Sequence, residues 1–248
     1  MHRNKRCKIK LMSNKSNRMP LIDALKAVAA MLVLLNHFSS YGPLAEAARE
    51  AFPAIFDWCF EYGRMAVQVF LVIAGFLAAR GLSAQGEALA VSPLPLIWKR
   101  YLRLAVPYLA AIGLAIIAAA LANQWLDDEA IPDRATFAQW LAHAFLLHNL
   151  LGFEALSAGV WYIAIDFQLF ALMTLLLWAG RARLVAPALV LIVATTSLFW
   201  FNRDASWDNW AIYFFGSYGL GAAAWWASDR RQLAFWMGAI VTVAVAAL

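Results

Sequence analysis

The sequence predicts an all-α fold, a polytopic bundle of transmembrane helices. Of its 248 residues, 64% are hydrophobic and 14% are charged, and the apolar residues gather in long runs. About seven to eight of these runs are long enough to cross a bilayer as helices. The basic residues form short clusters between the runs, so the net charge of +5 needs no nucleic acid as partner. The composition instead implies a lipid bilayer as partner.

The basic N-terminus sets the expected orientation. Residues 1–18 are rich in Lys and Arg and show no apolar periodicity, which is typical of a solvated tail. Because basic segments stay on the cytoplasmic side, we expect this tail in the cytoplasm and residues 19–248 to form one transmembrane domain. The final apolar run, 233–248, has no polar flank, so we expect the domain to be incomplete at its C-terminus. Two cysteines indicate neither a disulfide framework nor a metal site.

The charged residues between the apolar runs indicate on which side of the membrane each connection lies. The expected spans are 21–40, 63–79, 104–121, 161–179, 184–201, 211–227 and 233–248. The acidic residues of 41–62 indicate an external loop, and the basic run 98–103 indicates an internal loop. Segment 137–152 has about sixteen residues, at the short end for a crossing. A full crossing there would turn every later basic loop outward, so this segment is expected to be re-entrant or to lie on the surface.

The first span, 21–40, carries the most informative polar residues. Lys26 and His37 are eleven positions apart, so they return to within roughly 20° of one helix face, about 16 Å apart along the axis. Ionisable groups in a membrane span are costly and are therefore functional candidates. A neutral imidazole accepts a proton near pH 7, which suits a general base. The alternative is a structural histidine whose hydrogen bonds are satisfied within the protein.

Two further sites carry charge near or inside the predicted spans. Arg100 and Arg103 are spaced i, i+3, so they share a helix side and can clamp phosphate groups. The alternative is ordinary cationic anchoring at the cytoplasmic face. Asp166 lies inside the span 161–179, where a carboxylate requires a partner such as a histidine or arginine on a neighbouring helix. It is alternatively one half of a structural ion pair.

Four stretches carry a resemblance to a known family. They are I-D-A-L-K-A-V-A-A…N-H from residue 22, V-Q-V-F-L-V-I-A-G-F-L at 67–77, Arg100-x-x-Arg103 followed by Pro107, and the segment 161–170. Their content and order resemble the membrane acyltransferase family 3, bacterial enzymes that acylate cell-envelope glycans and related exported carbohydrates. Lys26 stands where the family usually has arginine, Gln68 and Ala74 stand where Asp and Ser are common, and Asp166 stands for Glu.

The resemblance implies an activity and a set of roles. It implies transfer of an acyl group, commonly acetyl, from cytoplasmic acyl-CoA to a hydroxyl of a carbohydrate or glycolipid, in the inner membrane of a bacterium. Arg100 and Arg103 would hold the CoA phosphates, and no metal is implied. His37 would deprotonate the acceptor or carry the acyl group, with Lys26 and Asp166 completing the catalytic set.

Two other functions stay open at this point. Buried His, Lys and Asp side chains also build proton relays in transporters, although the sequence shows no inverted repeat. A truncated, non-catalytic homologue is the other alternative, because Lys26, Ala74 and Asp166 depart from the family pattern.

Overall fold

The computed structural model describes residues 19–40, 42–126, 131–181 and 185–228, which are helical with connecting turns and contain no strand. The helices are α1 (Pro20–Ser40), α2 (Gly42–Ala51), α3 (Pro53–Tyr62), η1 (Gly63–Met65), α4 (Ala66–Leu82), α5 (Pro93–Ala122), α6 (Phe137–Ala144), α7 (Val160–Ala179), α8 (Val185–Phe199), η2 (Phe201–Arg203), η3 (Ala205–Trp207) and α9 (Ala211–Ala227). The predicted tail 1–18 and the predicted span 233–248 lie outside the described residues. Within them, the all-α prediction is confirmed.

Several of these helices have the length and composition of membrane spans. In the described part of the chain there are five such stretches: Pro20–Ser40, Pro53–Leu82, Pro93–Ala122, Val160–Ala179 and Val185–Arg203. α9, with 17 residues, rises about 25 Å and matches the predicted span 211–227. The protein is therefore a multi-pass membrane protein.

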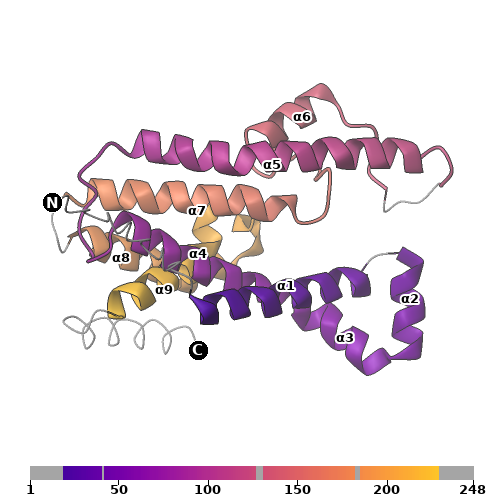
Figure 1. Cartoon of the computed structure of the whole chain (residues 1–248), viewed down its shortest axis with the longest axis horizontal. Coiled ribbons are helices and arrows are strands. Elements are labelled where there is room, and N and C mark those ends of the chain that lie inside the picture. Colours follow the sequence, from indigo (N-terminus) through magenta and orange to yellow (C-terminus); the bar gives the residue numbers. More distant parts are fainter. Residues whose placement is uncertain (1–18, 41, 127–130, 182–184, 229–248) are drawn as a thin grey trace, which may run out of the picture.

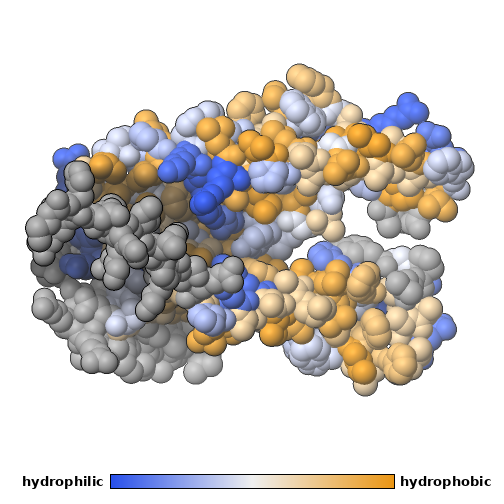
Figure 2. Space-filling view, viewed as in Figure 1, coloured by the Kyte–Doolittle hydropathy of each residue, from blue (hydrophilic) through white to orange (hydrophobic). Residues whose placement is uncertain are grey.

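The long helices run roughly along one direction and form a bundle with two arms (Figure 1). α4, α7, α8 and α9 share one hydrophobic core, which includes Leu71, Leu169 and Phe215. α5 packs along α7, and α1 packs against α3 and α4. At one end, α1 to α3 form one arm and the end of α5 with α6 forms the other. Figure 2 shows an open cleft between these two arms, both covered largely by apolar residues.

Glycines allow α4 and α9 to pack with their backbones in contact. A Cβ at Gly75 would lie 1.9 Å from the Tyr218 carbonyl oxygen, and one at Gly221 would lie 1.9 Å from the Val72 carbonyl oxygen. No other residue type fits these two positions without moving a helix. Small residues at a membrane helix interface permit such close approach. This pair makes the most extensive helix contact among the described residues.

The third span begins earlier than predicted. The basic run 98–103 was expected in a loop before a span at 104–121, but α5 runs unbroken from Pro93 to Ala122. The loop prediction is wrong because prolines in the first helical turn need no N–H partner and pre-set the helical φ. Arg100 and Arg103 therefore lie well inside a helix. Their side chains keep fixed positions along it rather than on a mobile loop.

Two predicted connections also differ from the structure. The segment 41–62, predicted as a loop, contains α2 and α3, which an ion pair between Arg49 Nε and Asp57 Oδ1 joins at 3.1 Å. In the segment 137–152 only α6 is helical, and its eight residues rise about 12 Å, far short of a bilayer core. α6 alone is therefore too short to cross the membrane, and the prediction that this segment is re-entrant or lies on the surface stays a prediction. A capping box between Thr136 and Gln139 stabilises the N-terminus of α6.

Candidate functional site

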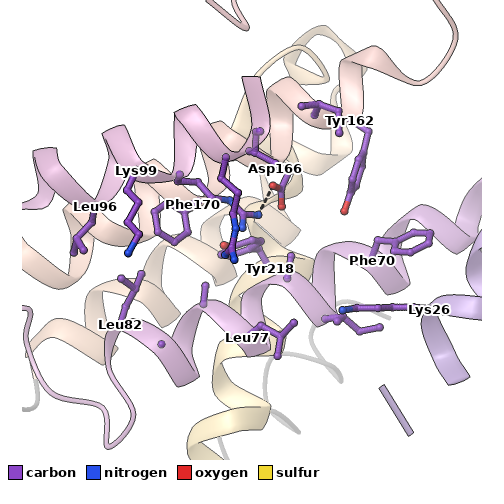
Figure 3. A pocket seen from close by; sticks show the side chains of 18 residues that line it. Lys26, Phe70, Leu77, Leu82, Leu96, Lys99, Tyr162, Asp166, Phe170 and Tyr218 are labelled. Atoms are coloured by element: carbon purple, nitrogen blue, oxygen red, sulfur yellow. Dashed lines mark hydrogen bonds and ion pairs between the residues drawn. The ribbon is translucent and has the colours of Figure 1, made fainter. Parts of the chain in front are cut away.

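A cavity of about 810 Å³ opens between α4, α5 and α7, with α1 and α9 closing its sides (Figure 3). Most of its wall is apolar, from residues such as Leu77, Leu104 and Phe170. The wall also carries five ionisable side chains and two tyrosines: Lys26, Lys99, Arg100, Arg103, Asp166, Tyr162 and Tyr218. An apolar cavity with a few convergent polar groups is the usual form of a ligand site.

An ion pair joins α5 and α7, two of the helices that form the cavity wall. Arg100 Nη2 of α5 donates to Asp166 Oδ2 of α7 at 2.5 Å. The Asp166 side chain is only 6% exposed and that of Arg100 is 27% exposed. The guanidinium also lies over the Phe170 ring, 5.3 Å from its centroid. The prediction that Asp166 has an arginine or histidine partner on a neighbouring helix is confirmed.

The remaining cations give the cavity excess positive charge. Lys26, Lys99 and Arg103 line it along with the ion pair, so four cations face one carboxylate. In Figure 3, Lys99 and Lys26 lie on opposite sides of Asp166. The predicted shared side of Arg100 and Arg103 is confirmed, since both line the same wall. A low-dielectric cavity of one sign attracts and concentrates ions of the opposite charge, here anions such as phosphates.

His37 is the one predicted site residue outside this cavity. It lies about three turns along α1 from Lys26, about 16 Å further toward the end that carries the two arms. Beside it, the Asn36 amide donates to the carbonyls of Cys59 and Phe60, both at 3.0 Å. Asn36 thereby fixes the end of α1 against α3. The structure thus brings four of the five predicted residues together and holds His37 on a separate, well-braced turn.

Comparison with known proteins adds to this geometry. The family model described as "Acyltransferase domain" matches residues 20–248 of the sequence. The chain belongs to the membrane acyltransferase family 3. A curated relative, the regulator of hypoxia-inducible factor 1 of Caenorhabditis elegans, is 28% identical in an alignment 179 residues long that covers 67% of this chain and 35% of that protein. The chain therefore spans about a third of that relative. No solved structure matches this chain significantly.

The structure adds two residues that sequence reasoning missed in this acyltransferase-family chain. Tyr162 lies one helical turn before Asp166 on α7, so the i, i+4 spacing was a usable signal. Tyr218 had no such signal, because it lies beyond the recognisable motifs in a helix that reads as a generic span. The glycine contacts of α4 and α9 place it in the cavity wall.

Two buried histidines form a second polar cluster at the C-terminal end of α6. The rings of His143 and His148 stack at 4.0 Å with an interplanar angle of 9°. The backbone N–H of Leu156 donates to His143 Nε2 at 3.2 Å, so the other nitrogen, Nδ1, carries the proton and donates to the Gln139 carbonyl at 2.9 Å. This pairing needs neutral His143. The five-residue spacing did not predict this contact, because two residues five apart do not share a face of a regular helix. The contact depends on a turn at Leu146, where φ is 58°.

The histidine pair predicts acid sensitivity of this segment. Burial, together with the smaller effect of the neighbouring His143, lowers the pKa of His148 to about 4. Unfolded histidine binds protons near pH 6.5, so stability is full above that pH and falls as the pH drops toward about 4. We expect the free energy of opening of 137–156 to fall by up to about 1.4 kcal/mol per pH unit. Amide hydrogen exchange at pH 7 and pH 5 measures it.

Replacing His148 by phenylalanine supplies the control for this prediction. The variant keeps a ring to stack on His143 but cannot take up a proton. Its opening free energy should therefore depend less steeply on pH than that of the parent protein. Equal slopes in the two proteins would contradict the assignment of the effect to His148.

Proposed function

We propose that the chain is an integral membrane acyltransferase that moves an acyl group, most simply acetyl, from cytoplasmic acyl-CoA to a hydroxyl of a cell-envelope carbohydrate or glycolipid. The single observation that carries the proposal is the cavity between α4, α5 and α7 in a chain of an acyltransferase family. It combines an apolar wall with four cations. Acyl-CoA has the matching parts, namely a phosphorylated end and a largely uncharged arm.

The donor would occupy the cavity with its phosphates on the cations. Lys99, Arg100 and Arg103 lie within about 6 Å of rise on one side of α5, a compact set for neighbouring phosphate groups. Arginine forks bind phosphate oxygens in a bidentate way, which lysine does not. The apolar side chains of α4 and α7 would cover the uncharged arm. Asp166 would orient Arg100 through the ion pair.

The acceptor would react at His37. In one route the imidazole takes the proton of the acceptor hydroxyl, whose oxygen attacks the thioester carbonyl, and CoA leaves as the thiolate that then takes up a proton. In the other route the imidazole itself attacks the thioester and CoA leaves as the thiolate; the acceptor hydroxyl then takes the acyl group from the imidazole, and its proton goes to the thiolate. Both routes require the thioester to reach His37 from the cavity. The separation of about 16 Å along α1 suits a donor that enters from one membrane face and an acceptor at the other.

The expected orientation follows from charge. The start of α1, the connection from α4 to α5 and the C-terminal end of α7 lie toward the same end of the bundle (Figure 1). Arg80 and Arg181 lie at this end. The positive-inside rule therefore favours it as the cytoplasmic face. We propose the inner membrane of a bacterium as the location, with the arms outward.

Acetyl transfer in isolated membranes tests the proposal. Membranes with the parent protein, His37→Ala, Arg103→Ala or the control Arg134→Ala receive radiolabelled acetyl-CoA, at equal protein level. Arg103→Ala should bind CoA about tenfold to a hundredfold more weakly, because it loses a charge-assisted hydrogen bond. His37→Ala should bind CoA normally and transfer label about 10² to 10⁴ times more slowly. Arg134 is exposed and lies outside the cavity, so its variant should match the parent.

Two outcomes would contradict the proposal in different ways. A parent protein that binds CoA and transfers no label would be a non-catalytic homologue. A parent protein that binds no CoA would favour a proton-coupled transporter, in which Lys26, Asp166 and His37 serve as relay groups.

A further inference from the structure

Tyr218 of α9 lies in the cavity wall with its hydroxyl unused. The residue is 0% exposed, and its hydroxyl is buried without a hydrogen-bond partner among the described residues. It lines the same cavity as Arg100 and Asp166, and Figure 3 shows Tyr218 near Asp166. A buried hydroxyl without a partner destabilises a protein, and such groups are rare. In a residue that lines a cavity, such a hydroxyl is therefore expected to meet its partner in a bound molecule.

The surroundings of Tyr218 leave its hydroxyl available. Arg100, Asp166 and Tyr162 are its electrostatic neighbours. Arg100 Nη2 and Asp166 Oδ2 are engaged with each other, and neither is hydrogen-bonded to the tyrosine. The close packing of α9 on α4 fixes the tyrosine backbone, since the Tyr218 carbonyl lies directly against Gly75. The tyrosine backbone is thus held in place, and the residue lines the cavity that also contains the ion pair.

We propose that the Tyr218 hydroxyl is a binding group for the acyl donor and donates a hydrogen bond to one of its oxygen atoms. This inference rests on the proposed function. The acceptor is either a phosphate oxygen or a carbonyl oxygen of the uncharged arm, since acyl-CoA carries both. A tyrosine hydroxyl suits this place because it adds a donor without adding charge to a wall that already holds four cations.

Tyr108 offers a matched control in the same protein. It is also buried, at 6% exposure, and its hydroxyl also has no hydrogen-bond partner in the described part of the chain. It belongs to a separate cluster of buried hydrophobic residues that includes Ile112 and Leu156, and it does not line the cavity. Removal of the Tyr108 hydroxyl therefore shows how the loss of a buried, unpaired hydroxyl outside the cavity affects stability and CoA binding.

The experiment compares Tyr218→Phe and Tyr108→Phe with the parent protein. Each protein is purified in detergent, its thermal midpoint is measured without ligand, and CoA and adenosine 3′,5′-bisphosphate are titrated by calorimetry. Tyr218→Phe should bind CoA about tenfold more weakly, because one hydrogen bond to the ligand is lost. Its midpoint should stay the same or rise, because an unpaired buried hydroxyl is removed. Tyr108→Phe should bind CoA like the parent.

The two ligands identify the acceptor oxygen. Weaker binding of both CoA and the bisphosphate by Tyr218→Phe would place the hydrogen bond on a phosphate. Weaker binding of CoA alone would place it on a part of CoA that the bisphosphate lacks, namely the second phosphate of the diphosphate or the arm. Unchanged affinity for both ligands, with the parent binding CoA, would overturn this inference and leave the proposed function standing. A parent that binds neither ligand would overturn both. A lower midpoint with unchanged affinity would show that the hydroxyl is structural.

Discussion

Replacing Gly75 by alanine is expected to lower the thermal midpoint of the purified protein by about 2–12 °C. The added methyl group would lie 1.9 Å from the Tyr218 carbonyl oxygen and 2.7 Å from its carbon. Both atoms belong to backbone, so a whole helix must move rather than a flexible side chain. Overpacking of this kind costs about 1–3 kcal/mol, and each kcal/mol corresponds to about 2–4 °C in a chain of this size. The same shift should weaken CoA binding, because it displaces Tyr218.

Gly113→Ala is the matched control for this prediction. Gly113 also lies in a membrane-spanning helix, and a Cβ there would meet nothing within 4 Å. Its midpoint should therefore stay within a few degrees of the parent. Gly221→Ala should resemble Gly75→Ala, and the double variant should cost less than the sum, since both glycines serve one contact. A Gly75→Ala protein as stable as Gly113→Ala would contradict the close contact of α4 and α9.

The sequence predicts the spans better than it predicts their neighbours. Hydropathy shows which segments enter the bilayer, and the predicted bounds 211–227 agree with α9. It does not show which faces of two apolar helices meet, because lipid and protein are equally apolar partners. Gly75 could be recognised as a point of close approach, but its partner on α9 could not. For this reason Tyr218 was missed.

The candidate site shows the same limit. Charged residues stand out against an apolar sequence, so Lys26, Arg100, Arg103 and Asp166 could all be predicted, and the structure brings them into one cavity. Their depth could not be predicted, since the start of α5 depended on prolines that also suit a loop. His37 was placed on the face of Lys26 by its spacing. That spacing also puts it about 16 Å away along the helix, outside the cavity.

The Arg100–Asp166 pair should separate stability from binding. Arg100→Gln leaves a carboxylate that is 6% exposed without its cation, and such a change costs about 3–5 kcal/mol. The thermal midpoint should therefore fall by roughly 6–20 °C. Asp166→Asn should cost less, because the Arg100 side chain is 27% exposed and retains its contact with the Phe170 ring. Thermal unfolding of the ligand-free variants measures both effects.

The double variant Arg100→Gln/Asp166→Asn shows whether the ion pair serves stability alone or also CoA binding. It leaves no buried charge unpaired, and two amides can hydrogen-bond to each other, so its midpoint should return to within a few degrees of the parent. Its CoA affinity should stay as low as that of Arg100→Gln, because the phosphate-binding fork is absent from both. Asp166→Asn, which keeps Arg100, should still bind CoA. A double variant that regains CoA binding along with stability would show that the ion pair holds the helices together and takes no part in holding the donor.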